Sequence, residues 1–220
     1  MNTSKAITLE QKAGLEFAYI EALAPYLRTR QGYGIPRKYV EHHPDVFIQA
    51  IVWTYKRSDG DEDPPEWTVA PNDGRNLATR GYKLLDRLRQ MPGYNDLGEL
   101  EAVRLSKWVK TVREKCTELG RSEITDICLG QLLSHAPADP GGVWPCMPVR
   151  QVMEELQSEK ISHGARTGLY NQRGVVWRGE GGGQERELAQ KYRRWAEALA
   201  YEDGQDVRVR SEPPRYRSWH

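Results

Sequence analysis

The feature of this sequence that most constrains its fold is a succession of apolar residues at helical spacing, interrupted by proline and glycine. The longest such pattern covers Asp96 to Leu119 and ends at Gly120, a residue favoured just after a helix. Its apolar positions recur every three or four residues, as one buried helix face requires. The positions expected to be buried are Leu97, Leu100, Val103, Leu105, Trp108, Val109, Val112, Cys116 and Leu119.

Further helices are predicted on both sides of this one. A capping-box pattern begins a helix at Thr8, near the N-terminus. Asp45 to Lys56 follows a proline and is apolar on nearly all sides, which predicts a central buried helix, with a strand as the alternative. Ser122 caps another amphipathic helix. Asn76 to Gln90 predicts a helix whose inward residues are Leu77, Tyr82, Leu85 and Leu88.

The stretch from Trp144 to Ala200 predicts two helices that flank an irregular, glycine-rich connector. The connector begins at Ser162, contains several glycines, and ends where the helix from Glu185 begins. Within it, Gly174 to Trp177 predicts a short strand or extended segment. The sequence as a whole therefore predicts an all-α fold, a multi-helix array of sequential antiparallel helices with one irregular Gly-rich excursion.

Composition divides the chain into four segments. Residues 1–57 are expected to form N-terminal helices, and 58–75 an exposed acidic, proline-rich loop. Residues 76–200 are expected to form the main helical domain. The basic tail at 201–220 has two prolines and little apolar content, so we expect it to be poorly ordered.

Charge and cysteine content favour a soluble protein of the cytoplasm. The net charge is only +1, so no general electrostatic attraction to nucleic acid or membrane is expected. The three cysteines form no CxxC pair and are odd in number, which favours a reducing compartment. No apolar signal segment or membrane span is visible.

No motif in the sequence demands a particular chemistry. The glycine run at 179–183 lacks the Gly-Lys-Ser/Thr of a phosphate-binding loop. His42 and His43 are adjacent, so on a helix their side chains would diverge. Cys128 and His135 lie about two turns apart, too far for a nucleophile and its base. We therefore predict no catalytic, cofactor-binding or metal-binding residues, and treat Cys116 and Cys128 as small buried apolar residues.

Polar and aromatic residues in the connector are candidates for binding a protein partner. They either hold the connector against the helices through stacking and hydrogen bonds or present a surface to another protein. The candidate residues are Tyr170, Asn171, Arg173, Trp177 and Arg178.

The C-terminal part of the chain offers an alternative, a nucleic-acid-binding surface. Basic and aromatic side chains are interleaved there, and such an arrangement can bind phosphates and stack on bases. Three acidic residues on the same helix, Glu185, Glu187 and Glu197, count against it. The candidate residues are Lys191, Arg193, Arg194, Arg215 and Arg217.

Three sequence patterns between about Ile124 and Leu199 carry a resemblance to a larger class of proteins. They are W-P-C-x-P-V-R from Trp144, Y-N-x-R-G from Tyr170, and the helix start G-G-x-Q-E-R-E-L-A-x-K-Y-R. This region resembles the C-terminal helical region of very large, uncharacterised multidomain bacterial proteins with a suggested link to defence. This chain lacks their large N-terminal portion. After Ala200 it has Asp-Gly-Gln-Asp and a basic tail where they are expected to continue a helix.

The resemblance implies a detached helical module and supplies no catalytic role. Together, these observations predict a non-catalytic helical protein-interaction or scaffold module. Its partner would be another protein, bound without a cofactor. The alternative is a nucleic-acid-binding accessory module that uses the basic C-terminal helix and tail.

Overall fold

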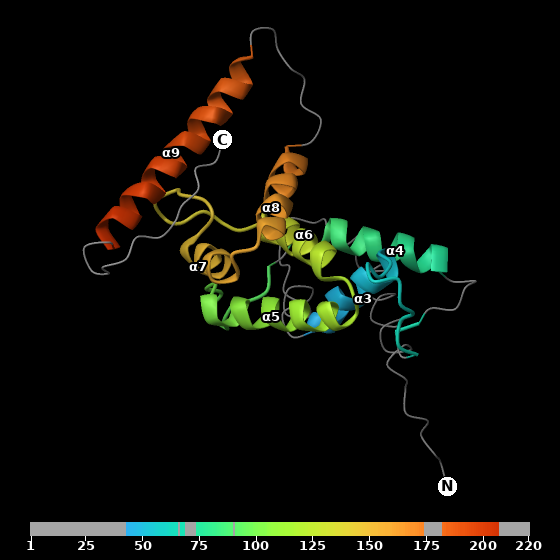
Figure 1. Ribbon diagram of the computed structural model, residues 1–220. Coiled ribbons are helices and arrows are strands. Elements are labelled where there is room, and N and C mark those ends of the chain that lie inside the picture. Colours follow the sequence, from blue (N-terminus) through green and yellow to red (C-terminus); the bar gives the residue numbers. More distant parts are fainter. Residues whose placement is uncertain (1–42, 66, 69–73, 90, 174–181, 207–220) are drawn as a thin grey trace. The chain divides into compact units, whose positions relative to one another are not determined.

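The computed structural model describes residues 43–65, 67–68, 74–89, 91–173 and 182–206 (Figure 1). In these residues the regular elements are seven helices, with no strand and one isolated antiparallel bridge between Tyr94 and Leu100. The predicted all-α class is confirmed. The helix predicted at Thr8, the extended segment at 174–177 and the tail beyond residue 206 lie outside the described residues. No helix in the described part has the length and apolarity needed to span a membrane.

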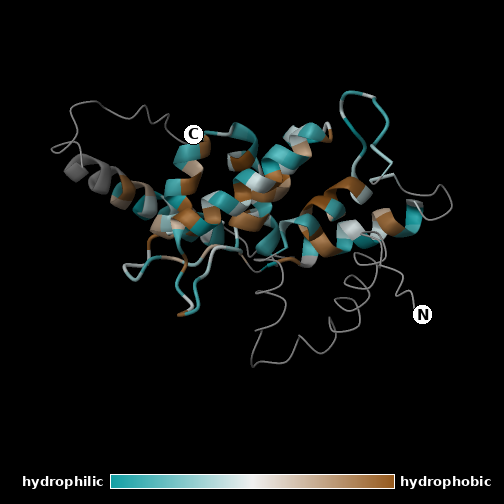
Figure 2. Cartoon of the chain, turned by 90° about the horizontal axis from the view of Figure 1, so that it is seen from below, coloured by the Kyte–Doolittle hydropathy of each residue, from teal (hydrophilic) through white to brown (hydrophobic). Residues whose placement is uncertain are grey.

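The chain forms two compact units, which interleave along the sequence. The first comprises Met1–Ala136 and Met147–Gln172, and the second Pro137–Cys146 and Arg173–His220. The four segments predicted from composition are continuous stretches of the chain. Each of the two units is defined by contacts in space and combines two separate stretches. Hydrophobic and hydrophilic residues lie on different sides of the helices, as amphipathic packing requires (Figure 2).

The first unit begins with α3 (Pro44–Thr54), which packs against α4 (Gly74–Arg87). The predicted central helix is confirmed, because five residues of α3 are buried: Phe47, Ile48, Ala50, Ile51 and Val52. The inward face of α4 was predicted incorrectly at one position. Tyr82 is 58% exposed, while its neighbour Leu84 is buried against Ala50.

The helix predicted from Asp96 begins later, as α5 (Ala102–Glu118). Asn95 keeps the preceding residues out of the helix, since its side-chain oxygen accepts hydrogen bonds from the backbone N–H groups of Leu97 and Glu99. The predicted burial of Leu97 is therefore wrong, and so is that of Val103, which lies within α5 on its exposed side. Their side chains are 84% and 81% exposed.

The turn after α5 is a Schellman motif. Gly120 has a φ of +65°, the Arg121 N–H donates to the Cys116 carbonyl, and the Gly120 N–H donates to the Thr117 carbonyl. This geometry confirms Gly120 as the end of the helix predicted there. It also directs the Arg121 side chain toward the loop that follows α3.

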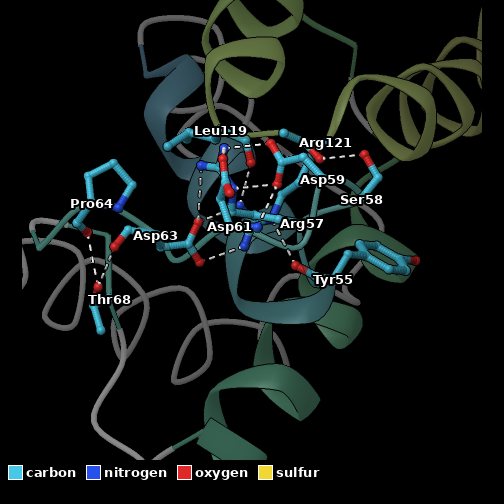
Figure 3. A network of polar contacts seen from close by, with 11 residues as sticks. Tyr55, Arg57, Ser58, Asp59, Asp61, Asp63, Pro64, Thr68, Leu119 and Arg121 are labelled. Carbon is cyan, nitrogen blue, oxygen red and sulfur yellow. Dashed lines mark hydrogen bonds and ion pairs between the residues drawn. The ribbon is translucent and has the colours of Figure 1, made fainter.

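Arg121 holds the acidic loop in place (Figure 3). Its side chain is 2% exposed and forms a bidentate ion pair with Asp63, with N···O distances of 2.6 and 2.7 Å. The same guanidinium donates to the carbonyls of Tyr55 and Leu119. Residues 58–62, the first part of the predicted loop, are exposed, and Asp63 is held by the buried Arg121.

The closest helix packing in the first unit joins α6 (Ser122–Leu133) and α8 (Glu159–Gln172). A Cβ atom on Gly164 would lie 2.1 Å from the Ile127 carbonyl oxygen, and one on Gly130 would lie 2.1 Å from the Ile161 carbonyl oxygen. The prediction of an irregular connector from Ser162 is therefore wrong as far as Gln172. Its glycines permit two helix backbones to approach each other.

A buried carboxylate joins three helices of this unit. Asp126 on α6 is 7% exposed and accepts two hydrogen bonds from Arg113 on α5, at 2.7 and 2.9 Å. Ser158, just before α8, donates to the same carboxylate at 2.6 Å and accepts from the Ile161 N–H. Ser158 thus caps α8 and links it to α6.

The second unit contains α9 (Gly183–Asp206) and the loop at 137–146. Trp195 donates to the Gly142 carbonyl at 2.8 Å, and its ring centroid lies 5.8 Å from that of Trp144. The helix continues six residues beyond Ala200, where the sequence was expected to leave the helix.

Candidate functional site

The candidate site is an open groove between α5 and α7 (Met147–Leu156) in the first unit. Figure 1 labels these two helices. Each helix is fixed by residues on its inner side. Trp108, Val109 and Val112 bury one face of α5, and Val149 and Val152 bury one face of α7. With these faces occupied, the remaining sides of the two helices form the walls of the groove.

The groove has a volume of about 660 Å³, and its lining surface is mostly apolar. Polar and charged side chains surround this apolar part. The lining residues are Ala102, Val103, Ser106, Lys107, Lys110, Thr111, Glu114, Gln151, Val152 and Glu155.

Four of the lining residues form a single stripe along α5. Val103, Lys107, Lys110 and Glu114 follow one another at intervals of four, three and four residues. Such spacing places them on one helix face, and that face lies opposite the buried one because a helix turns about 100° per residue. The stripe therefore presents an exposed valine, then two lysines, then a glutamate.

Glu155 connects the two walls of the groove. Its carboxylate accepts hydrogen bonds from the Ser106 hydroxyl, at 2.6 Å, and from the Lys110 ammonium. The hydrogen bond from Lys110, helped by that from Ser106, holds the pKa of Glu155 below its usual value. Lys110 is thus neutralised, while Lys107 and Glu114 form no ion pair with another residue in the described part of the chain.

Two buried cysteines and a half-buried histidine in the described part of the first unit, outside the groove, have shifted pKa values. Burial raises the pKa of Cys116 to about 11 and that of Cys128 to about 12, so both remain thiols at neutral pH. Burial and the nearby Arg89 lower the pKa of His135. Within the described ranges, no three His, Cys, Asp or Glu side chains are grouped as a metal site would need.

The partner-binding residues predicted from the sequence lie outside the groove. Tyr170, 64% exposed, and Asn171 are in the last turn of α8. The boundary between the two units separates them from Arg173, and Trp177 and Arg178 lie outside the described residues. The end of α8 is fixed by Gln172, which is adjacent to Asn171 and was not among the predicted residues. Its side-chain amide donates hydrogen bonds to the Ser134 carbonyl and hydroxyl.

The predicted nucleic-acid residues are partly described. Lys191, Arg193 and Arg194 are exposed on α9, whereas Arg215 and Arg217 lie outside the described residues. The Lys191 ammonium is 4.6 Å from the centroid of the Trp195 ring, and Tyr192 packs edge-on against the same ring. A basic and aromatic cluster therefore exists on this helix.

The groove itself was not found by sequence reasoning. Val103 was assigned to the buried face, although a count of 100° per residue puts it opposite Leu105, Val109 and Val112. The sequence signal that could have indicated the groove is Val103 itself, an apolar residue on the charged side of an amphipathic helix.

The chain was compared with models of protein families, with curated proteins and with solved structures, and none of these matches it.

Proposed function

We propose that this chain is a non-catalytic protein-interaction or scaffold module and that the α5–α7 groove receives its partner. The observation that supports this most is Val103, an 81% exposed valine at the end of an open and mostly apolar groove. Burial of such a side chain by a partner is favourable, at about 25 cal/mol for each Å² of apolar surface removed from water.

The form of the groove also favours a protein ligand. Protein interfaces combine an apolar centre with a polar rim, and the groove has this arrangement, with lysine, glutamate and glutamine side chains around its apolar lining. Both walls are helices whose inner faces are packed, so the surface does not have to be ordered upon binding.

Two glutamate substitutions test this proposal. Val103→Glu places a charge inside the groove, and Leu97→Glu places the same charge on an equally exposed apolar residue outside it. The full-length chain and both variants are used to capture proteins from nuclease-treated lysate of the native host, with identification by mass spectrometry. Circular dichroism verifies that each variant folds.

We expect one protein to be captured by the wild type and by Leu97→Glu and to be lost with Val103→Glu. A partner retained equally by all three chains would exclude the groove as its binding site. If neither the wild type nor the variants capture a protein, the interaction-module proposal fails.

A second candidate function is nucleic-acid binding through α9. It is supported by the exposed Arg193 and Arg194 beside the Lys191, Tyr192 and Trp195 cluster. Binding of single-stranded DNA or RNA is measured by fluorescence anisotropy at several salt concentrations. Arg193→Ala/Arg194→Ala should weaken binding and reduce its salt dependence.

The control for this measurement removes the same charge from another helix. Arg75→Ala/Lys83→Ala changes two exposed basic residues of α4. An equal loss in both double variants would indicate a general charge effect and would contradict a site on α9.

Location and origin are part of the proposal. We propose a cytoplasmic bacterial protein, supported by three buried free cysteines, which suit a reducing compartment. The resemblance of the region from about Ile124 to Leu199 to large bacterial proteins supports a module derived from such a protein.

A further inference from the structure

The charges along the groove indicate what kind of partner it accepts. On α5, Lys107 and Glu114 are exposed groove residues without an ion-pair partner among the described residues. They are seven residues apart, so about 10 Å separates them along the helix axis. Between them, Lys110 is already neutralised by Glu155. The stripe therefore has an apolar end at Val103, a positive position one turn later and a negative position two turns after that.

We infer that the occupant of the groove is an amphipathic helix of another protein, which carries an acidic residue against Lys107 and a basic residue against Glu114. This inference rests on the proposed interaction function. The two charged residues of the partner would lie two helical turns apart. Its apolar face would cover Val103, the exposed apolar residue of the groove.

The shape of the groove favours a helix over an extended peptide. The α5 wall runs from Ala102 to Glu114, a length of about 18 Å, which three turns of a partner helix match. Side chains of a third helix can pack into the space between two others, whereas an extended peptide gains most from the open edge of a sheet. The described residues contain no sheet.

Charge complementarity would mainly set the orientation of the partner. Exposed ion pairs are weak, and each is expected to change affinity by roughly two- to fivefold. In a partner parallel to α5, the acidic residue comes first in the sequence. In an antiparallel partner the basic residue comes first, so the order reports the direction of binding.

A display experiment tests this inference. A phage library of 18-residue helical peptides, randomised at its surface positions, is selected on the full-length chain, and binders that also bind Val103→Glu are removed. We expect the remaining peptides to carry opposite charges seven residues apart. The same selection on Lys107→Glu/Glu114→Lys, which reverses both exposed charges, should enrich peptides with the opposite order.

Three results would overturn the inference. They are groove-dependent peptides whose charges do not respond to the reversal, enrichment of peptides that circular dichroism finds non-helical in the complex, and a failure to obtain groove-dependent binders. Self-association of the chain that Val103→Glu abolishes would identify a second copy as the occupant and would also contradict it. In each case the lysate comparison of Val103→Glu with Leu97→Glu still decides the proposed function independently.

Discussion

At the level of single residues, two buried charges do much to define the first unit. Arg121 is surrounded by Asp63 and by two backbone carbonyls, and Asp126 by Arg113 and Ser158. Each connects segments that are distant in the sequence. Because every donor or acceptor in such a network is satisfied by the others, removal of one partner leaves the rest buried without a hydrogen bond.

Asp126→Ala should lower the free energy of unfolding by about 2 kcal/mol. This is less than for a fully buried pair, because a third of the Arg113 side chain remains exposed. Urea unfolding monitored by circular dichroism measures the change. Glu123→Ala is the matched control, since it removes an exposed ion pair with Lys160 from the same helix and should change stability much less. Equal effects of the two substitutions would show that Asp126 does not have the proposed structural role.

The buried thiols predict a loss of stability at alkaline pH. Burial raises the pKa of Cys128 to about 12 from an ordinary value near 9.0. Above pH 9 the unfolded chain loses this proton while the folded chain keeps it, so the free energy of unfolding falls until the pH passes the folded pKa. The slope of the free energy of unfolding against pH is proportional to the number of protons released on unfolding, and Cys128→Ala should lower that number by up to about one. Urea unfolding at several values between pH 8 and pH 11 measures the slope, and identical slopes for both chains would contradict the assignment.

At the level of elements, the sequence predicts helices well and the faces they bury less well. The apolar periodicity located α3, α5 and α6, because one buried face leaves a regular pattern. It misplaced Tyr82, Leu97 and Val103, which are all exposed. Leu97 precedes the helix because of the Asn95 turn, and Val103 lies on the helix face opposite Leu105, Val109 and Val112.

The error at α8 has a different physical cause. Gly164 and Gly168 suggest a helix breaker when the sequence is taken alone, since glycine is unfavourable inside a helix by about 1 kcal/mol relative to alanine. In the fold they face α6, where their lack of a side chain permits a close approach of two backbones. A contact between distant segments cannot be recognised from local sequence.

Gly164→Ala tests this account of the α6–α8 contact. The added methyl group would lie 2.1 Å from the Ile127 carbonyl oxygen, so the helices must move apart. We expect a loss of about 1–3 kcal/mol in the free energy of unfolding despite the higher helix propensity of alanine. Gly141→Ala, where a Cβ atom meets nothing within 4 Å, should leave stability nearly unchanged. Greater stability of Gly164→Ala in thermal or urea unfolding would contradict close packing at this position.

At the level of the whole molecule, the described helices form two units, and the candidate site lies within the first. The sequence predicted the fold class. It directed attention to Tyr170 and its neighbours, because a group of aromatic and basic residues among glycines can be recognised in a sequence. A groove was not visible, because its two walls are about 40 residues apart in the chain and meet only through packing.

The central claim, that the α5–α7 groove binds a protein, is tested most directly by photo-crosslinking in cells of the native host. A benzophenone amino acid replaces Thr111, an exposed residue of the groove, or Thr79, an exposed residue of α4. The two positions are matched, because each threonine hydroxyl donates to the carbonyl four residues earlier. We predict a discrete crosslinked protein from position 111 and none from position 79. Crosslinks at neither position, or the same products at both, would contradict the claim.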